Sequence, residues 1–371
     1  MKQLKEEKGS ITLFVLVSML FFVLFLTGAY MLSSLGQQTG ISETAKIKEI
    51  YEKDMNRIDD IYATLVNKRV YYVNDKEGNK IPVPNGFSPI TTKDQGTKET
   101  GFVIKNDTDG NEYVWVPVDD TTSYQYARVA FTRTGWKYRQ TLNTTNGQIK
   151  RADVTGYVFK ETMPKITENV TELQSVTQFG GFYIGRYETG IIGYDKEVMT
   201  TNSGNKTSWT GYTGGTAVVQ KEKQVWNYIT RDKAREVAEG MYTTNGAVIS
   251  RLCSSYAWDT TLRFIETKHE GYATNSEKGN YSGTLQLTGQ STPVNNIYDM
   301  GGNVYEITSE VSTNSTNTVT LRGGTYYGSA SSHPAALRSV SPRGEEIRFG
   351  ISPSLIYSDV TSKIDRRTIF L

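Results

Sequence analysis

The longest hydrophobic run of the chain lies near its N-terminus, at residues 11–32, and contains no charged residue. As an α-helix this run is about 33 Å long at 1.5 Å per residue, which is enough to cross the hydrocarbon core of a bilayer. Buried helices of soluble domains seldom carry uncharged apolar runs of this length. The pattern therefore predicts a transmembrane helix.

A second hydrophobic pattern follows between residues 41 and 70, where the sequence contains neither Gly nor Pro. Its apolar residues recur at steps of three and four, which places them in one stripe of a helix. They are Ile47, Ile50, Tyr51, Met55, Ile58, Ile61, Tyr62 and Leu65. We expect one long helix over residues 10–69, with a transmembrane first half and an amphipathic second half. The stripe packs either on the chain's own globular domain or on other copies in a filament.

From residue 70 the pattern changes to short runs of β-type residues separated by turn residues. Residues 70–73, 101–104 and 113–118 are the clearest strands, and Asp109-Gly110-Asn111 predicts a hairpin between the last two. Three prolines lie within residues 70–100, which we expect to be an extended connector.

Residues 101–371 are expected to form a single large domain. Two helices are predicted within it, at residues 232–241, with Thr230 as the N-cap, and at residues 254–268. The stretch from 140 to 180 is polar and indicates no particular element. The rest is rich in Gly, Ser, Thr and Asn, which is typical of many short strands joined by long loops.

Composition and charge narrow the classes of partner. The formal net charge is +2 with no basic stripe, so we expect no nucleic-acid partner. The single cysteine, Cys253, excludes an internal disulfide framework and argues against a cysteine-based metal site. The abundance of Tyr, Thr, Asn and Gly is typical of exposed extracellular proteins. We therefore expect a head outside the cell, held at the cell membrane or presented on the cell surface or a pilus.

The N-terminus carries a recognisable processing pattern. Residues 1–9 form a basic leader that ends in Gly9, directly before the apolar helix. This arrangement resembles type IV prepilins and pseudopilins, which implies a prepilin peptidase that cuts between Gly9 and Ser10, and other pilin subunits as partners. Phe14 stands where that family usually has Glu at the fifth mature position. An uncleaved signal anchor, or cleavage after Ala29, are the alternatives.

Six sequence blocks occur in a fixed order along the head. They are residues 113–117 (YVWVP), 181–188 (GFYIGRYE), 250–259 (SRL followed by Trp258 and Asp259), 298–306 (YDMGGNVYE), 321–325 (LRGGT) and 338–339 (RS). These blocks resemble the formylglycine-generating-enzyme-like family, also called sulfatase-modifying factors. The resemblance implies an α+β head of C-type-lectin-like fold, with many short strands and two main helices. Cys253, Tyr305 and residues 349–351 depart from the family's pattern.

The block at residues 298–306 suggests a metal site. In the resembled family this turn often holds a calcium ion. The matching ligands are the side chains of Asp299 and Glu306 and the carbonyls of Gly302 and Val304. Carboxylate and carbonyl oxygens suit a hard cation. The alternative is that the two acidic side chains only cap the turn through hydrogen bonds.

The same resemblance argues against catalysis. The enzymes of the family use two cysteines and copper, and the matching positions fall near Gly328 and His333, so we expect no copper. Cys253 lies in another block and is interpreted as a buried small residue. Only His269 and His333 could serve an iron site, and nothing in the sequence brings them together. We therefore expect a protein that is not an enzyme.

The last third contains a candidate ligand surface. Variable proteins of diversity-generating retroelements share this fold, and they diversify residues after the strand that matches 321–325. The comparable window is residues 326–343, with a composition of Tyr, Ser and Gly that suits adaptable binding surfaces. Its candidate ligand-binding residues are Tyr326, Tyr327, Ser329, Ser331, Ser332, His333, Ser339, Ser341 and Arg343. The alternative is that the tyrosines are half-buried and the serines form an ordinary solvated loop.

Together these patterns predict a non-catalytic, adhesin-like surface protein whose lectin-like head binds an extracellular protein or glycan. Three alternatives stay open: a structural minor pilin or pseudopilin, a divergent enzyme of the same fold, and a variable protein of a diversity-generating retroelement.

Overall fold

The computed structural model describes residues 19–24, 26–27, 69–118, 126–132, 135–138, 170–193, 215–227, 229, 231–311, 318–342, 349–351 and 353–357. The chain divides into two compact units, Met1–Val66 and Asn67–Leu371.

In the first unit, residues 19–24 and 26–27 are helical and carry exposed apolar side chains, with Phe21 68% and Phe22 63% exposed. No helix among the described residues is both long enough and apolar enough to span a bilayer. Most of the predicted transmembrane run, the amphipathic stripe and the Gly9–Ser10 bond lie outside the described residues.

The second unit is built on an antiparallel six-stranded sheet in the order β12-β17-β8-β5-β4-β3. Its strands are β3 (Phe87–Pro89), β4 (Val103–Asn106), β5 (Glu112–Pro117), β8 (Gly181–Gly185), β12 (Val248–Leu252) and β17 (Pro353–Tyr357). The C-terminal strand β17 pairs with both β12 and β8. This non-local pairing joins the last described residues of the chain to the middle of the sheet.

The hairpin predicted at residues 109–111 is confirmed. It joins β4 to β5, whose register pairs Ile104 with Tyr113. The side chain of Asn106 accepts hydrogen bonds from the backbone N–H groups of Thr108 and Asp109, at 2.9 and 3.0 Å. This side-chain capping of a turn is typical of Asn and holds the two strands in register.

Residues 70–100 do not form the extended connector that their prolines suggest. They contain β1 (Val70–Asn74), β2 (Lys80–Pro84), β3 and the 3-10 helix η1 (Lys93–Gln95). Strands β1 and β2 pair as a two-stranded ribbon, and Ile81 and Val83 are fully buried. The prolines are tolerated in β2 because it pairs on one side only, with β1. The segment is therefore part of the head.

The remaining strands of this unit form three smaller sheets. A four-stranded sheet has the order β15-β14-β13-β16, a three-stranded sheet the order β10-β9-β11, and β6 pairs with β7. Their bounds are β6 (Val129–Thr132), β7 (Gly135–Tyr138), β9 (Gly190–Ile192), β10 (Thr216–Val218), β11 (Gln224–Val225), β13 (Tyr305–Val311), β14 (Thr318–Arg322), β15 (Ser339–Pro342) and β16 (Phe349–Ile351). Strand β16 runs parallel to β13, and the other pairs are antiparallel.

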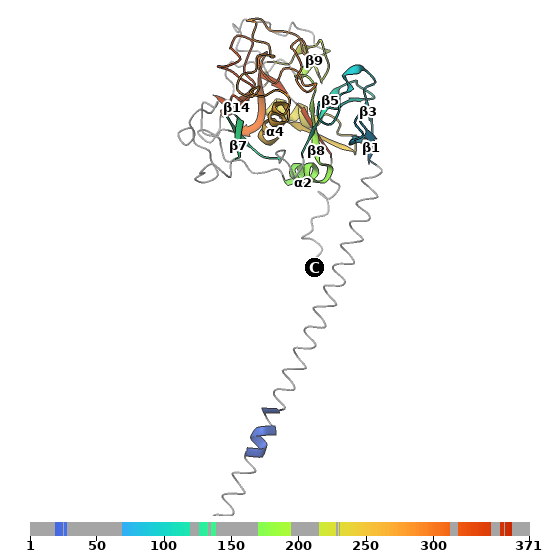
Figure 1. Cartoon of the computed structure of the whole chain (residues 1–371), viewed down its shortest axis with the longest axis vertical. Helices are drawn as coiled ribbons and strands as arrows, with labels where there is room; N and C mark the ends of the chain where they lie inside the picture. Colours follow the sequence, from blue (N-terminus) through green and yellow to red (C-terminus); the bar gives the residue numbers. More distant parts are fainter. Residues whose placement is uncertain are drawn as a thin grey trace, which may run out of the picture. The chain divides into compact units, whose positions relative to one another are not determined.

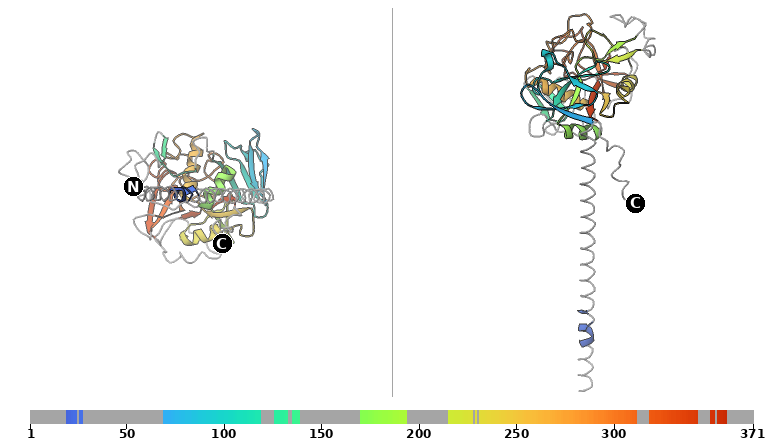
Figure 2. Two further views of the ribbon diagram at one scale, coloured as in Figure 1. Left: turned by 90° about the horizontal axis from the view of Figure 1, so that it is seen from below. Right: turned by 90° about the vertical axis from the view of Figure 1, so that its right-hand side faces the viewer.

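Three helices lie among the described residues of this unit: α2 (Val170–Phe179), α3 (Arg231–Gly240) and α4 (Ser255–Glu266). The last two confirm the predicted helices at 232–241 and 254–268, whereas α2 was not predicted. Ser254 caps α4, because its hydroxyl accepts the backbone N–H of Ala257 at 3.0 Å. Helix α4 lies inside the unit beside β5, and α2 lies at its outer edge (Figure 1; Figure 2).

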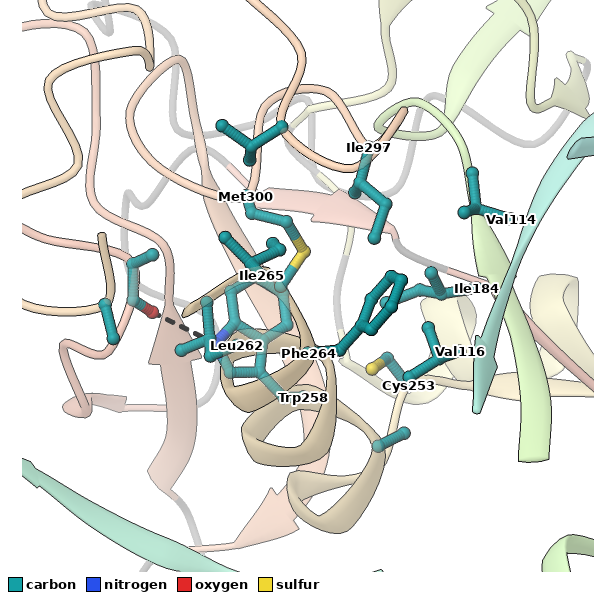
Figure 3. Packing of buried hydrophobic residues seen from close by; sticks show 14 of the residues in the cluster. Val114, Val116, Ile184, Cys253, Trp258, Leu262, Phe264, Ile265, Ile297 and Met300 are labelled. Atoms are coloured by element: carbon teal, nitrogen blue, oxygen red, sulfur yellow. Dashed lines mark hydrogen bonds between the residues drawn. The ribbon is translucent and has the colours of Figure 1, made fainter. Parts of the chain in front are cut away.

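The main core forms between α4 and the central strands. Phe264 of α4 points toward Ile184, and Cys253 lies beside Val116, while Trp258 and Leu262 of the same helix belong to the same buried cluster (Figure 3). The indole N–H of Trp258 donates to the carbonyl of Ala335 at 3.0 Å, so this large side chain is buried with its polar atom satisfied. The core thus ties α4 to the loop that precedes β15.

Candidate functional site

The turn at residues 299–304 is held in an unusual backbone conformation. Asp299, Gly302 and Asn303 all have positive φ, at 57°, 80° and 51°. A Cβ at Gly302 would lie 2.3 Å from the carbonyl oxygen of Asn280, so only glycine fits. The backbone N–H of Asn303 donates to that same carbonyl at 2.8 Å. The turn is therefore fixed against the loop that contains Asn280.

The side chain of Asn303 sits at the centre of this turn. Its Nδ2 donates to Glu188 Oε2 at 2.6 Å and to the carbonyl of Gln286 at 3.2 Å. Its Oδ1 accepts from Asn280 Nδ2 at 2.8 Å and from the backbone N–H of Gln286 at 3.0 Å. One buried amide thus fastens the turn to Glu188 and to the loop that contains Asn280 and Gln286, and it orients Glu188 toward the turn.

Three carboxyl groups are buried around this turn: Glu188, Asp299 and Glu306. Burial raises the pKa of each of them. The charge of Asp299 also raises the pKa of Glu188 and of Glu306, so these groups are within electrostatic reach of one another. None of them forms an ion pair with a described Lys or Arg. The cluster therefore needs protons or a cation to neutralise it.

The predicted calcium ligands partly fit this cluster. Oε2 of Glu306 is buried and has no hydrogen-bond partner, which leaves an oxygen ready for a cation. Asp299 is more engaged, because its Oδ2 accepts the backbone N–H of Gly289 at 2.9 Å. Gly302 and Val304 lie in the turn between the two acids, and the N–H of Val304 donates to Glu188. No group of three His, Cys, Asp or Glu among the described residues has metal-binding geometry, so the carbonyls would have to complete the site.

A second buried cluster, which we call the arginine network, joins Arg128, Asp259, Glu310, Arg322 and Arg338. Glu310 contacts Arg128 at 2.8 Å and Arg338 at 3.0 Å, while Asp259 contacts Arg322 at 2.7 Å and Arg338 at 3.2 Å. All five side chains are at most 2% exposed. The network links β6, α4, β13 and β14 to the segment before β15, and so it supports the loops of the window.

The charges in this network shift the pKa values of its members. Burial by itself would raise the pKa of Glu310, but the positive charges of the three arginines outweigh burial and lower this pKa to about 2. Burial, followed by repulsion from Arg338, lowers the pKa of Arg322 to about 10. Asp259, Arg322 and Arg338 belong to the sequence blocks, but nothing in the sequence marked Glu310 or Arg128. Their pairing joins residues far apart in the chain, which no local pattern records.

The predicted ligand window begins directly after the LRGGT block. Gly324 has φ of 80°, and a Cβ there would lie 2.0 Å from the carbonyl oxygen of His333, so the loop closes tightly on this glycine. Tyr326 is only 4% exposed, whereas Tyr327 is 60% exposed and packs edge-on against it at 5.2 Å. The two tyrosines thus differ in role, with Tyr326 as the buried support and Tyr327 facing solvent.

The serines of the window form a small exposed network. The hydroxyls of Ser329 and Ser332 lie 2.6 Å apart, and that of Ser332 lies 2.8 Å from Nδ1 of His333. Ser331 is also exposed. The structure therefore gathers Tyr327, Ser329, Ser331, Ser332 and the half-buried His333 on one loop.

The remaining predicted window residues lie apart from this loop or outside the described residues. Ser339 and Ser341 are on β15, opposite Leu321 and Val319 of β14. The side chain of Ser341 and all of Arg343 lie outside the described residues.

No family model matches the sequence, and no curated protein matches it. Among solved structures, PvdO from Pseudomonas aeruginosa matches with a TM-score of 0.38 and 12% identity, over 69% of this chain and 98% of PvdO. Treponema denticola variable protein 1 matches with a TM-score of 0.21 and 12% identity, over 77% of this chain and 90% of that protein. Both TM-scores lie below 0.5, so neither similarity assigns a family or a function to this chain. The expected mixed α+β class, with many short antiparallel strands and few helices, is confirmed.

Cys253, His269 and His333, the residues considered for catalysis in the sequence, lie in three different environments. Cys253 is fully buried, and burial raises the pKa of its thiol well above the ordinary value. Burial, and then the amine of Lys278 at 3.3 Å, lower the pKa of His269, whereas the ring of His333 contacts the hydroxyl of Ser332. These groups form no nucleophile–base pair with one another among the described contacts.

Proposed function

We propose that this protein is a non-catalytic binding protein whose head recognises an extracellular protein or glycan through the loop of residues 327–333. The observation that carries the proposal is the contrast between the two tyrosines. Tyr327 presents an aromatic side chain to solvent from a loop anchored by buried Tyr326, whose N–H donates to the carbonyl of Asn303 at 2.9 Å. A rigid exposed aromatic beside serines binds with little loss of conformational entropy.

We extend the proposal to how the head is displayed. The apolar run at residues 11–32 holds the chain in a membrane, and processing between Gly9 and Ser10 makes it a pilin-like subunit of the cell surface. The exposed apolar side chains of residues 19–24 support this, because such surface is stable when lipid or another helix covers it. The N-terminal residue of the mature protein tests it: Ser10 is expected, and Met1 would indicate an uncleaved anchor.

Calcium belongs to the proposal as a structural ion. Asp299 and Glu306 would hold it, with the carbonyls of Gly302 and Val304. Its charge would neutralise the buried acids and fix the turn that carries Asn303, which in turn anchors the window. The partnerless Oε2 of Glu306 supports this assignment.

The absence of an enzymatic role is also a proposal. Its support is that the sole thiol of the sequence is buried with a raised pKa, so that the nucleophilic thiolate is disfavoured at neutral pH.

Substitution Tyr327→Ala tests the window. We expect it to weaken binding at least about tenfold, because tyrosine is enriched among the few interface residues whose truncation costs about 2 kcal/mol or more. The full chain in detergent is screened against host proteins and a printed glycan array, and the affinity for each bound partner is then measured by surface plasmon resonance.

The matched control for this experiment is Tyr72→Ala. Tyr72 is likewise exposed, at 52%, but it lies on β1 and outside the window. Unchanged affinity for Tyr72→Ala and a loss for Tyr327→Ala support the proposal. Equal affinities for wild type and both variants, or no bound partner in the screen, contradict it.

A further inference from the structure

A polar pocket of about 440 Å³ lies beside the window, in the loops between α4 and the turn at residue 299. Its volume is within the range of about 300–1,000 Å³ that is usual for small-molecule sites. The lining includes Glu277, Lys278, Tyr281, Gln286, Gln290 and Ala330. None of these residues was singled out by the sequence blocks, and Ala330 alone belongs to the window.

The floor of this pocket is preformed. Asn280 is buried, and its Nδ2 donates to the carbonyl of Thr284 at 2.9 Å as well as to Asn303. Its Oδ1 accepts the hydroxyl of Ser282 at 2.7 Å. Because these bonds fix the loop without any ligand, little ordering is needed on binding.

The lining indicates the chemistry of the ligand. One Lys and one Glu are present, so the formal charges balance, and the other polar side chains are amides, hydroxyls and a phenol. Ala330 is the only purely aliphatic side chain of the lining. Gln286 and Gln290 line the pocket with side-chain amides, each of which offers two donors and one acceptor oxygen to a ligand. Such a set matches a neutral, polyhydroxylated molecule better than a lipid or a strongly charged group.

The pocket and the window are held together by hydrogen bonds. The hydroxyl of Tyr281 donates to the carbonyl of His333 at 2.8 Å, and the N–H of Gly283 donates to the carbonyl of Tyr326 at 2.8 Å. A ligand seated in the pocket therefore lies beside the loop that presents Tyr327.

We infer that this pocket binds a neutral saccharide unit of the ligand, with the amides of Gln286 and Gln290 as its main hydrogen-bonding groups. The inference rests on the proposed function of the window as a ligand surface and narrows its ligand to a glycan.

The test uses the full chain in detergent on a printed array that carries neutral glycans, with terminal galactose, mannose or N-acetylglucosamine, and sialylated or sulfated ones. We expect binding to neutral glycans, weakened about tenfold or more by the double variant Gln286→Ala/Gln290→Ala, since each lost amide removes a hydrogen bond. Gln224→Ala, an exposed glutamine on β11 that does not line the pocket, is the matched control and is expected to bind as wild type does.

The outcomes separate the two proposals. Loss of glycan binding in the double variant, with an unchanged thermal midpoint, supports the saccharide pocket. The pocket inference is overturned, with the window intact, if Tyr327→Ala weakens binding of any partner while the double variant binds as wild type. Binding only to sialylated or sulfated glycans, or to no glycan, also overturns it. If neither Tyr327→Ala nor the double variant changes binding, both proposals fail.

Discussion

Substitution Glu310→Gln is expected to destabilise the head by about 3–5 kcal/mol, because it leaves the buried arginines with too little negative charge. Glu310 contacts Arg128 and Arg338 directly, with Arg322 3.9 Å away, in a region closed to water. Glutamine keeps the shape of the side chain, so the loss reports charge rather than packing. Urea unfolding of the full chain in detergent, followed by circular dichroism, measures the change.

The control and the pH dependence make this prediction specific. Glu236→Gln removes an exposed partner of Lys233 and is expected to cost less than about 1 kcal/mol. The folded pKa of Glu310 lies below its ordinary value, so its contribution is present above pH about 4.5 and is lost as the pH falls toward about 2. Glu310→Gln should lack this loss. Equal stabilities for the two glutamine variants at pH 7 would contradict the arginine network as described.

Calcium is expected to raise the thermal midpoint of the full chain, and Glu306→Gln is expected to remove most of that response. Calcium at 100 times its Kd stabilises the folded state by about 2.7 kcal/mol, because it binds only that state. In chelator the sign reverses: Glu306→Gln should be more stable than wild type at pH 7, since it removes an ionisable carboxyl that is buried and whose Oε2 has no hydrogen-bond partner. Thermal melts with calcium and with chelator measure both effects.

The pH dependence in chelator gives a second measure of the same cluster. The raised pKa of Glu306 means that its charge opposes folding, so stability should rise as the pH falls through the folded pKa toward the ordinary value near 4.5. Glu172 and Glu266, whose pKa values burial raises to about 7, contribute with the same sign. The difference between wild type and Glu306→Gln gives the contribution of Glu306 together with its coupling to Asp299 and Glu188. A midpoint that calcium does not change in wild type would show that the head holds no structural calcium.

Local sequence patterns predicted the elements whose determinants lie close together in the chain. The hairpin at residues 109–111 follows from Asp-Gly between two β-type runs, and α4 begins where Ser254 offers a cap. The connector at residues 70–100 was predicted wrongly because proline is read as a strand breaker. In β2 it is tolerated, since that strand pairs on one side only.

The determinants that sequence could not supply are long-range. Strand β17 enters the sheet between β12 and β8. Arg128 forms an ion pair with Glu310, although the two residues are 182 positions apart in the sequence. The sequence indicated the window but not that Tyr326 is buried while Tyr327 is exposed, because that depends on the loop closing on Gly324. The polar pocket was missed for the same reason: its floor forms only when Asn280 meets Asn303.

The exposed loop at residues 327–333 is the ligand surface that we propose for the head. Hydrogen–deuterium exchange of the full chain, with and without a partner found in the screen, tests it most directly. On binding, we expect slower exchange at residues 326–333 and unchanged exchange in β1 and β2. Protection confined to other parts of the head, with residues 326–333 unaffected, would contradict the claim.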